Sequence, residues 1–524
     1  MTAFDPVLLE VFKHAFSAIA DEMGVVLRNA SYSPNIKERR DFSCAIFNRQ
    51  GHMIAQAAHI PVHLGSMPLS VAAAIQECQP LNPGDQIILN DPYRGGTHLP
   101  DFTLVAPVFM KENELVGYVA NRAHHADVGG IAAGSMSIAR EIYQEGLIIP
   151  PLKLLESSVL NQSVFNLILA NVRTPQERAG DIWAQIAANQ RGVQRLVETI
   201  DHYGQALTFE YMEELLNYTE RMTRALLARI PDGIYRFTDY LDDDGISDQP
   251  VPIKVTVTIK GDNAVVDFSG SSPQVKGSLN AVYAITLSAV YYVFRSLIGL
   301  DVPNNAGCLV PIQVIAPEGS VVNAQRPAPV AGGNVETSQR IVDVLLGALS
   351  SALPDKIPAA SQGTMNNVTI GGWDAQKQQG FAYYETIGGG GGARADKDGP
   401  SAIHSHMTNT LNTPIEALEF AYPLRVLRYQ IRPASGGEGK FRGGDGIIRE
   451  IELLCPVEIN LITERRRLAP YGLMGGQPGA RGENKLKRGE ATLPLSGKVN
   501  LYAERGDILC VYTPGGGGFG IKDA

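Results

Sequence analysis

The sequence lacks the long apolar runs of membrane proteins. No window of its 524 residues reaches the ~18 consecutive apolar residues of a membrane-spanning helix. The segment Met1–Pro6 lacks the basic start and the apolar stretch of a secretory signal peptide. Lys and Arg form no long run, and the formal net charge is −9 at pH 7. These absences argue against secretion, and against a membrane or a nucleic acid as the main partner.

Cysteine is scarce and scattered. The chain contains five cysteines, and no two of them form a Cys-x-x-Cys pair. An odd, dispersed set is typical of free thiols in a reducing compartment, so we expect a cytoplasmic protein without disulfides or a zinc–thiolate site. Cys44 lies close to a motif described below, and a buried thiol is the simpler interpretation of it.

The chain is too long for one hydrophobic core, and its composition is that of a globular protein. Hydrophobic residues make up 44% and charged residues 19% of its 524 residues, so two to four domains are expected. We predict a mixed α+β, multidomain protein. Its expected parts are an N-terminal region of strands and loops at 1–200, a central α/β region with long, buried helices at 201–425, and a strand-rich, glycine-rich region at 426–524.

Periodic apolar residues predict several helices. They recur at three-to-four spacing across residues 5–29, where Asp5 is suited to cap the helix and Pro6 to occupy its first position. Further helices are predicted at 64–78, 165–198, 203–230, 278–300 and 338–353.

Short strands bracket a polar loop in the N-terminal region. Strand-like runs at 85–90 and 102–109 flank this loop, and a run at 115–120 ends shortly before His124. A rigid scaffold often presents ligands on loops in this way. Other strands are predicted at 41–48, 235–240, 253–259 and 264–268.

Histidine and aspartate gather in two short segments of this region, Asn90–Asp101 and Asn121–Asp127. Seven of the ten histidines precede residue 130. His98 and Asp101 stand three residues apart across a proline, which favours a tight extended turn. Mixed nitrogen and oxygen ligands without sulfur suit Zn²⁺, Mn²⁺ or Fe²⁺. On these residues alone two interpretations stay open: a metal site, or a packed loop with hydrogen-bonded histidines.

These segments resemble the hydantoinase B/oxoprolinase family, and so do motifs along essentially the whole chain, in collinear order. The family contains B subunits of ATP-dependent hydantoinases and caprolactamase, the C-terminal half of 5-oxoprolinase, and metal-bearing subunits of acetone and acetophenone carboxylases. The matching motifs are Asp41–Ser43, His59–Met67, Asn90–Asp101, Arg122–Gly130, Ala331–Arg340, Tyr384–Gly390, Met407–Thr410 and Thr513–Gly520.

The resemblance implies a divalent metal, Zn or Mn and alternatively Fe, on four residues. His98 and Asp101 match the family's His-x-x-Asp pair. His124 matches its later histidine, and Asp41 matches an aspartate that completes the site in the lactamase members. We therefore expect His98, Asp101 and His124 to act in catalysis as well as in metal binding.

Each of five further candidate residues has more than one possible role. His125, which we include in the predicted catalytic set, and Asp127 are candidates to orient the ligands. His59 and His63 either line the same cavity or pack in the core. Glu336 is either an acid/base residue, as which it enters the predicted catalytic set, or a carboxylate that favours the start of the following helix.

The sequence offers no nucleotide site of its own. It lacks a Gly-x-x-x-x-Gly-Lys-Ser/Thr phosphate loop. A formal Gly-x-Gly-x-x-Gly begins at Gly515, but too few residues follow it for the helix of a dinucleotide-binding turn. The resemblance implies that ATP and Mg²⁺ bind a separate A-type (α) subunit with an actin-like fold, in an α2β2 heterotetramer.

The resemblance implies a two-step opening of a small cyclic amide: a lactam, a hydantoin or 5-oxoproline. The partner would phosphorylate the carbonyl oxygen, and this chain would hydrolyse the product with metal-activated water. One alternative is the metal subunit of an ATP-dependent ketone carboxylase, whose chains tend to be longer than 524 residues. The second alternative is a non-catalytic assembly subunit.

The remaining motifs predict structural roles. The glycines at 388–392 predict a flexible loop, and those between 436 and 482 predict positive-φ turns between strands. Glu385, His404 and His406 flank the first cluster, where surface or hinge roles are the simpler interpretation. For 465–467, an arginine triplet, we expect a salt-bridged surface.

Overall fold

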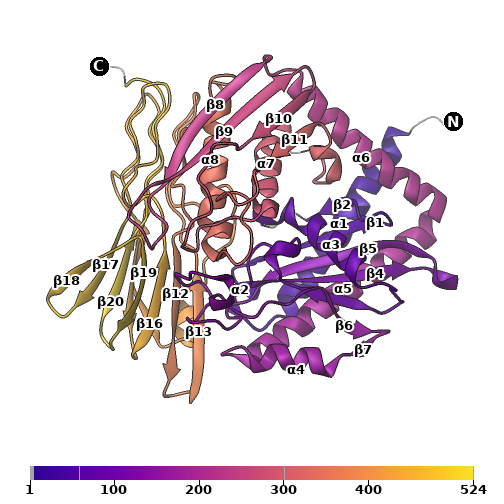
Figure 1. Ribbon diagram of the computed structural model, residues 1–524, viewed down its shortest axis with the longest axis horizontal. Coiled ribbons are helices and arrows are strands. Elements are labelled where there is room, and N and C mark those ends of the chain that lie inside the picture. The colour runs from indigo at the N-terminus through magenta and orange to yellow at the C-terminus, as the bar shows by residue number, and fades with distance from the viewer. Residues whose placement is uncertain (1–4, 58–59, 300, 523–524) are drawn as a thin grey trace.

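The computed structural model describes residues 5–57, 60–299 and 301–522. Within them the chain forms nine α-helices and twenty strands in four sheets, so the mixed α+β prediction is confirmed. Figure 1 shows the N-terminal sheet and its helices on one side, the central helices in the middle and the C-terminal strands on the other side. In the described part of the chain, no helix combines the length and the apolar character needed to span a membrane.

A seven-stranded antiparallel sheet organises the N-terminal region. Its strand order is β2-β1-β5-β4-β3-β6-β7. Every residue of β1 is buried, because helices cover both faces of the sheet at this point. The strands are β1 Phe42–Asn48, β2 Met53–Gln56, β3 Gln86–Leu89, β4 Asp101–Phe109, β5 Leu115–His124, β6 Leu152–Glu156 and β7 Val159–Leu160.

Helices α1 (Pro6–Ala30) and α5 (Pro175–Tyr203) cover one face of this sheet, and α3 (Ser66–Glu77) covers the other. The prediction for α1 is confirmed to within a residue at each end. The Asp5 carboxylate caps α1 by accepting a hydrogen bond of 2.8 Å from the backbone N–H of Val7. The buried stripe of α1 packs with apolar residues of β1 and β5 in one core.

The single helix predicted at 165–198 is two helices in the structure. Helix α4 (Gln162–Ala170) ends before α5 (Pro175–Tyr203) begins. Pro175 is the first residue of α5, where its missing N–H costs nothing, whereas inside a helix it would break the hydrogen-bond ladder. The prediction overlooked this proline. The following helix, predicted at 203–230, is confirmed as α6 (Gln205–Leu227).

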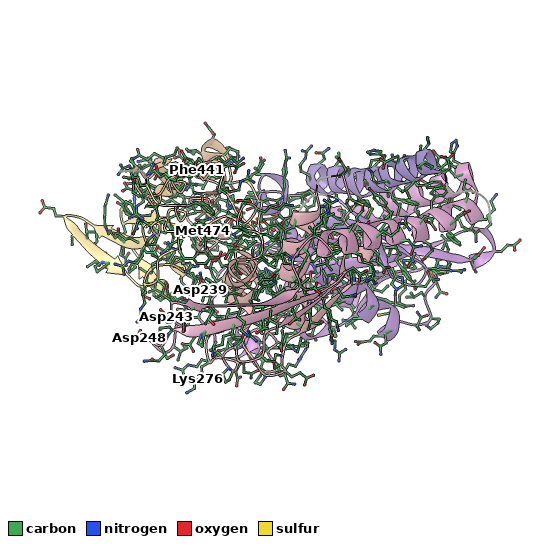
Figure 2. The ribbon with its side chains drawn as sticks, turned by 90° about the horizontal axis from the view of Figure 1, so that it is seen from above. Asp239, Asp243, Asp248, Lys276, Phe441 and Met474 are labelled. Carbon is green, nitrogen blue, oxygen red and sulfur yellow. The ribbon has the colours of Figure 1, made fainter. Side chains whose placement is uncertain are left out.

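The central region combines a four-stranded sheet with buried helices. Helix α8 (Ser338–Leu349) is buried almost throughout and directly follows a π-helical turn at Gly333–Thr337. Seen from above (Figure 2), Asp239 and Asp243 lie where the central strands reach the C-terminal region. The other elements are α7 Tyr283–Ile298, β8 Gly233–Leu241, β9 Val251–Lys260, β10 Asn263–Asp267 and β11 Ile312–Ile315.

Two sheets with a shared core form the C-terminal region, which confirms the strand-rich prediction. Their strand orders are β13-β12-β16-β19 and β14-β15-β20-β17-β18. The first sheet joins residues from both sides of position 425, and the three-part domain division stays a prediction. The strands are β12 Asn367–Asp374, β13 Gln379–Glu385, β14 Leu424–Ile431, β15 Ile447–Leu453, β16 Val457–Ile462, β17 Glu483–Arg488, β18 Ala491–Leu495, β19 Lys498–Ala503 and β20 Ile508–Tyr512. The remaining helices are α2 Pro34–Lys37 and α9 Ile415–Ala421.

The glycine clusters form a packed bundle of extended backbone, not a flexible loop. The N–H of Gly516 donates to the carbonyl of Gly444, and that of Gly444 to Gly391, at 2.9 and 2.8 Å. A Cβ on Gly516 would lie 1.9 Å from the Gly391 oxygen. Between 436 and 482, all of which the structure describes, Gly475 is the one glycine with a positive φ. Most of these glycines are therefore required because neighbouring backbone segments of the chain approach each other closely, and not because of turn geometry.

Candidate metal centre

Strand pairing brings three acidic and imidazole groups to one end of the N-terminal sheet. Asp101 begins β4 and His124 ends β5, and the two are direct partners in this antiparallel pair. Directly opposite residues of such a pair point to the same face of a sheet. Asp41 precedes β1, and its carbonyl accepts a hydrogen bond of 3.0 Å from the backbone N–H of His124.

A tight turn before β4 adds the second imidazole. The backbone N–H of Asp101 donates to the carbonyl of His98 at 3.1 Å, as the proline between them predicts. His98 Nε2 lies 3.3 Å from Asp101 Oδ2, and the rings of His98 and His124 have centroids 4.9 Å apart. One ligand atom from each of His98, Asp101 and His124 lies within 4.8 Å of the others.

The chemistry of these donors fits a divalent metal. Among the described residues, three buried atoms of the cluster have no hydrogen-bond partner: His98 Nδ1, Asp101 Oδ1 and His124 Nε2. Leaving buried polar atoms unpaired costs free energy, and native proteins rarely do so without a reason. Two imidazoles and a carboxylate are borderline-to-hard ligands that suit Zn²⁺ or Mn²⁺. The residues present therefore fit the metal that the sequence predicts.

Burial and charge set the protonation of the cluster. Burial, followed by the charge of His98, lowers the pKa of His124 well below its usual range, so its ring is neutral and able to act as a ligand. Burial alone would raise the pKa of Asp101, but His98 and His63 outweigh it and hold that pKa well below its usual value. Burial raises the pKa of Asp41 to about 7, although Arg39 opposes this.

The cluster borders a small cavity of about 20 Å³, which has room for roughly one water-sized occupant. The Tyr384 ring stacks on His124 with centroids 4.6 Å apart and planes 10° apart. Asn334, from the π-helical turn, places its side-chain nitrogen 3.0 Å from His98 Nε2. The cavity is lined by Asp41, Ile60, Val62, His63, Asp101, His124, Asn334, Val335, Met365, Tyr384, Thr386, Met407 and Thr408.

The structure places the other predicted histidines differently. His63 joins the centre, with Nε2 3.5 Å from Asp101 Oδ2. His125 does not, because Nε2 contacts Gln185 Oε1 at 2.9 Å and its ring packs on Phe102 at 4.3 Å. Burial lowers the pKa of His125 to about 4. His59 lies outside the described residues.

Asp127 shapes a loop. Its carboxylate accepts hydrogen bonds from the backbone N–H groups of Gly129 and Gly134, both at 3.1 Å. It also forms an ion pair of 2.9 Å with Arg173. All of its observed partners therefore lie on the loop after β5 or on Arg173, away from the cluster of possible ligands.

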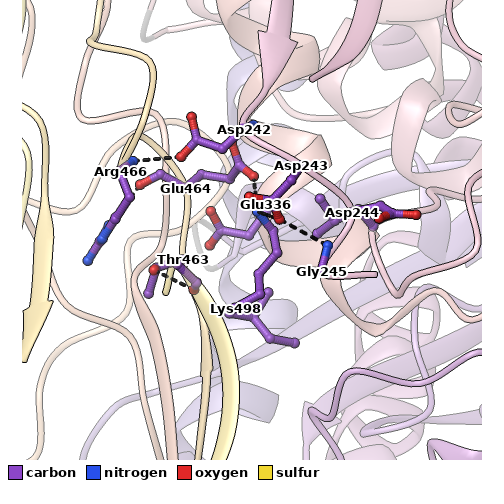
Figure 3. A network of polar contacts seen from close by, with 12 residues as sticks. Asp242, Asp243, Asp244, Gly245, Glu336, Thr463, Glu464, Arg466 and Lys498 are labelled. Carbon is purple, nitrogen blue, oxygen red and sulfur yellow. Dashed lines mark hydrogen bonds and ion pairs between the residues drawn. The ribbon is translucent and has the colours of Figure 1, made fainter. Parts of the chain in front are cut away.

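Glu336 lies outside the cavity lining but is connected to it. Glu336 Oε1 accepts from Asn367 at 2.6 Å, and the Tyr384 hydroxyl donates to the other end of the Asn367 amide at 2.8 Å. Figure 3 shows Glu336 beside Glu464 and Lys498. Burial raises the pKa of Glu336 to about 8, and the charge of Glu464 adds to this.

The residues expected at the surface are largely internal. Glu385 is buried and forms an ion pair of 3.0 Å with Arg449. His404 and His406 are half-buried. Arg465 is buried and binds both Asp239 and Asp343 at 2.7 Å. Opposite charges from distant segments compensate these groups for the water they lose inside the fold.

Three residues around His124 and His98 were not predicted from the sequence, namely Asn35, Asn334 and Tyr384. Asn334 and Tyr384 lie within motifs that carried the family resemblance, so a signal was present although no role was assigned. Asn35 lies in the short helix α2 and gave no signal, because its contact with His124 arises only from packing.

The comparisons with known proteins cover almost the whole chain. A protein of Methanocaldococcus jannaschii without an assigned function is 47% identical over 98% of this chain and 91% of its own length. The 5-oxoprolinase of Dictyostelium discoideum is 40% identical over 100% of this chain, which spans only 41% of that protein. The putative B subunit of a D-/L-hydantoinase from a Pseudomonas species is 34% identical over 98% of this chain and 90% of its own length.

Solved structures share the fold. The ATP-dependent caprolactamase of Pseudomonas jessenii superposes with a TM-score of 0.92 and 30% identity, over 99% of this chain and 92% of that one. An acetone carboxylase superposes with a TM-score of 0.89, over 98% of this chain and 76% of that one, but at 21% identity it shows the fold alone. Residues 5–522 match a single family along their whole length. The chain therefore belongs to the hydantoinase B/oxoprolinase family.

Proposed function

We propose that this chain is the metal-binding B subunit of an ATP-dependent hydrolase of cyclic amides, such as a lactam, a hydantoin or 5-oxoproline. The observation that carries the proposal is the buried group His98, Asp101 and His124, in which one possible ligand atom of each residue lies within 4.8 Å of the others and each side chain has an unpaired polar atom. The similarity to caprolactamase and 5-oxoprolinase supports the substrate class.

In this proposal His98, Asp101 and His124 hold a divalent metal, and Asp41 completes the site. When bound, such a metal would act as a Lewis acid, which lowers the pKa of water from 15.7 toward about 7. His63 helps to hold the carboxylate of Asp101 in place through its Nε2 contact. The ring of Tyr384 shields His124 from bulk water, because it stacks flat on the imidazole.

We infer that the activating step takes place on a separate A-type subunit. An amide carbonyl is a poor electrophile, and phosphorylation of its oxygen turns that oxygen into a leaving group. The chain has no phosphate loop for ATP. It spans 41% of the D. discoideum 5-oxoprolinase, so the rest of that protein has room for a counterpart of the partner. The Pseudomonas hydantoinase relative is itself one of several subunits by its name, and we propose an α2β2 assembly.

The cavity must widen for such a substrate. Its volume of about 20 Å³ is far below the roughly 300–1,000 Å³ of pockets that hold small molecules. Ile60 and Met407 line the cavity, and Val62 N–H donates to the carbonyl of Met407 at 3.2 Å. We propose that the two segments that contain Ile60 and Met407 separate when the activated substrate arrives from the partner.

The test is an assay of the chain co-purified with its A-type partner, given ATP and caprolactam, hydantoin, 5-oxoproline, or acetone with bicarbonate. The proposal predicts ATP-dependent opening of a cyclic amide, lost in His98→Ala and kept in His14→Ala, whose side chain is 77% exposed on α1. Turnover of acetone with bicarbonate, and of none of the cyclic amides, would instead identify a ketone carboxylase. Unchanged turnover of the His98→Ala complex would identify an assembly subunit.

A further inference from the structure

Arg39 is a fully buried arginine beside the candidate metal centre, outside the set of ligands and cavity-lining residues. It follows the short helix α2, and its side chain is 0% exposed. A buried guanidinium is costly unless several acceptors surround it. The acceptors that Arg39 binds therefore indicate which parts of the fold it holds together.

The guanidinium reaches two segments that are far apart in the sequence. Nη1 donates to Asn35 Oδ1 and, at 3.0 Å, to the backbone carbonyl of Tyr384. Nη2 donates to Thr386 Oγ1 at 2.8 Å and lies 3.9 Å from Asp41 Oδ2. Arg39 thus joins α2 to the end of β13, next to the predicted ligand Asp41.

Both of the residues bound by Nη1 contact His124. The Asn35 side-chain nitrogen donates to the carbonyl of His124 at 2.7 Å and lies 3.0 Å from its Nδ1. Tyr384 stacks flat on the imidazole, and the guanidinium carbon of Arg39 lies 4.8 Å from the centroid of the Tyr384 ring. The backbone carbonyl of His124 and one face of its ring are therefore held by residues that Arg39 contacts.

We propose that Arg39 is a positioning residue, which locks His124 in the orientation for metal binding by holding Asn35 against its backbone carbonyl and Tyr384 against the face of its ring. This inference rests on the proposed metal site. It assigns Arg39 no contact with substrate or metal. Residues that orient metal ligands in this way change metal affinity by roughly 10–100-fold when they are removed.

The positions of the three acceptors around Arg39 require the planar, forked guanidinium of an arginine. A single guanidinium reaches Asn35 Oδ1, the Tyr384 carbonyl and Thr386 Oγ1 in fixed directions. The ammonium of lysine is a point charge on a flexible stem and cannot reproduce this fork. Arg39→Lys should therefore lose most of the effect although it keeps the charge.

The test measures Zn²⁺ affinity by competition with a chromogenic chelator, on the chain without substrate. We expect Arg39→Met and Arg39→Lys to weaken Zn²⁺ binding by about 10-fold or more. Asn35→Ala should weaken it as well, and the double variant Arg39→Met/Asn35→Ala should bind no more weakly than Arg39→Met alone. The matched control is Arg449→Met, which removes another fully buried arginine, paired with Glu385, without touching the contacts of His124.

A second readout separates positioning from general damage to the fold. The visible absorption of bound Co²⁺ reports the ligand geometry, and it should change in Arg39→Lys while far-UV circular dichroism stays that of the wild type. Wild-type affinity and an unchanged Co²⁺ spectrum in folded Arg39→Lys would overturn the role of Arg39. A wild-type chain that binds no Zn²⁺ would overturn the metal site itself, which is a different failure.

Discussion

At the residue scale, the protonation of buried carboxyl groups is the feature most open to experiment. Glu336 is buried, and Glu464 lies close enough to disfavour its ionised form. Its Oε1 already accepts from Met365 N–H and Asn367, and Gln can keep both bonds. Because burial raises its pKa in the folded chain to about 8, Glu336 is largely protonated at neutral pH.

We predict that Glu336→Gln flattens the pH dependence of stability. Between the unfolded pKa near 4.5 and the folded pKa of about 8, the folded state binds the proton and the unfolded state has released it. The contribution of Glu336 to the free energy of unfolding must then fall as pH rises. The variant should gain up to about 1.4 kcal/mol relative to the wild type per pH unit across this window. Urea unfolding at pH 5, 6, 7 and 8 measures the difference.

The exposed Glu490→Gln is the control, and it should show no such trend. A constant difference between wild type and Glu336→Gln from pH 5 to pH 8 would show that Glu336 titrates normally, and would argue against its burial as described.

The clustering of the candidate ligands could be predicted from the sequence, and the residues that surround them could not. His98 and Asp101 share one turn and His124 follows a recognisable strand, so local spacing and the resemblance found them. Asn35 is 89 residues from His124. Tyr384 stacks on the same ring from a different sheet. Contacts of this kind depend on how whole elements pack, which a local pattern does not encode.

At the element scale, β5 explains why the adjacent His124 and His125 have different surroundings. The predicted strand ended at residue 120, but β5 continues to His124. Successive side chains along extended backbone point to opposite sides. With His124 turned toward the cavity, His125 faces Gln185 of α5. A longer predicted strand would have assigned the two rings to opposite faces from sequence alone.

The glycine bundle gives a prediction at the same scale. Gly516→Ala should destabilise the chain by about 3 kcal/mol or more, because overpacking against rigid backbone is costly and the new Cβ would lie 1.9 Å from the Gly391 oxygen. Gly380→Ala, in β13, is the matched control, since the nearest atom to its Cβ is 3.9 Å away. Thermal unfolding compares the two. Equal stability of both variants would contradict the bundle packing.

At the scale of the whole molecule, three regions of the chain contribute to one centre. The N-terminal sheet supplies the candidate ligands, the π-helical turn before α8 supplies Asn334, and β13 supplies Tyr384. A metal that binds only the folded state therefore stabilises the arrangement of all three regions.

Metal removal should lower the unfolding temperature. At a free Zn²⁺ concentration 100-fold above its dissociation constant, binding to the folded state alone adds about 2.7 kcal/mol. Chelator should remove this gain and Zn²⁺ should restore it, as followed by differential scanning fluorimetry. His98→Ala should show neither change, and a metal-dependent shift of equal size in that variant would place the stabilising ion elsewhere.

The most direct test of the proposed metal site is the metal content of the purified chain. It is measured by elemental mass spectrometry after equilibration with Zn²⁺ and desalting. The account predicts one ion per chain in the wild type and in His14→Ala, and less than a tenth of that in His98→Ala and Asp101→Ala. A wild-type chain without metal, or a His98→Ala chain with the wild-type content, would contradict it.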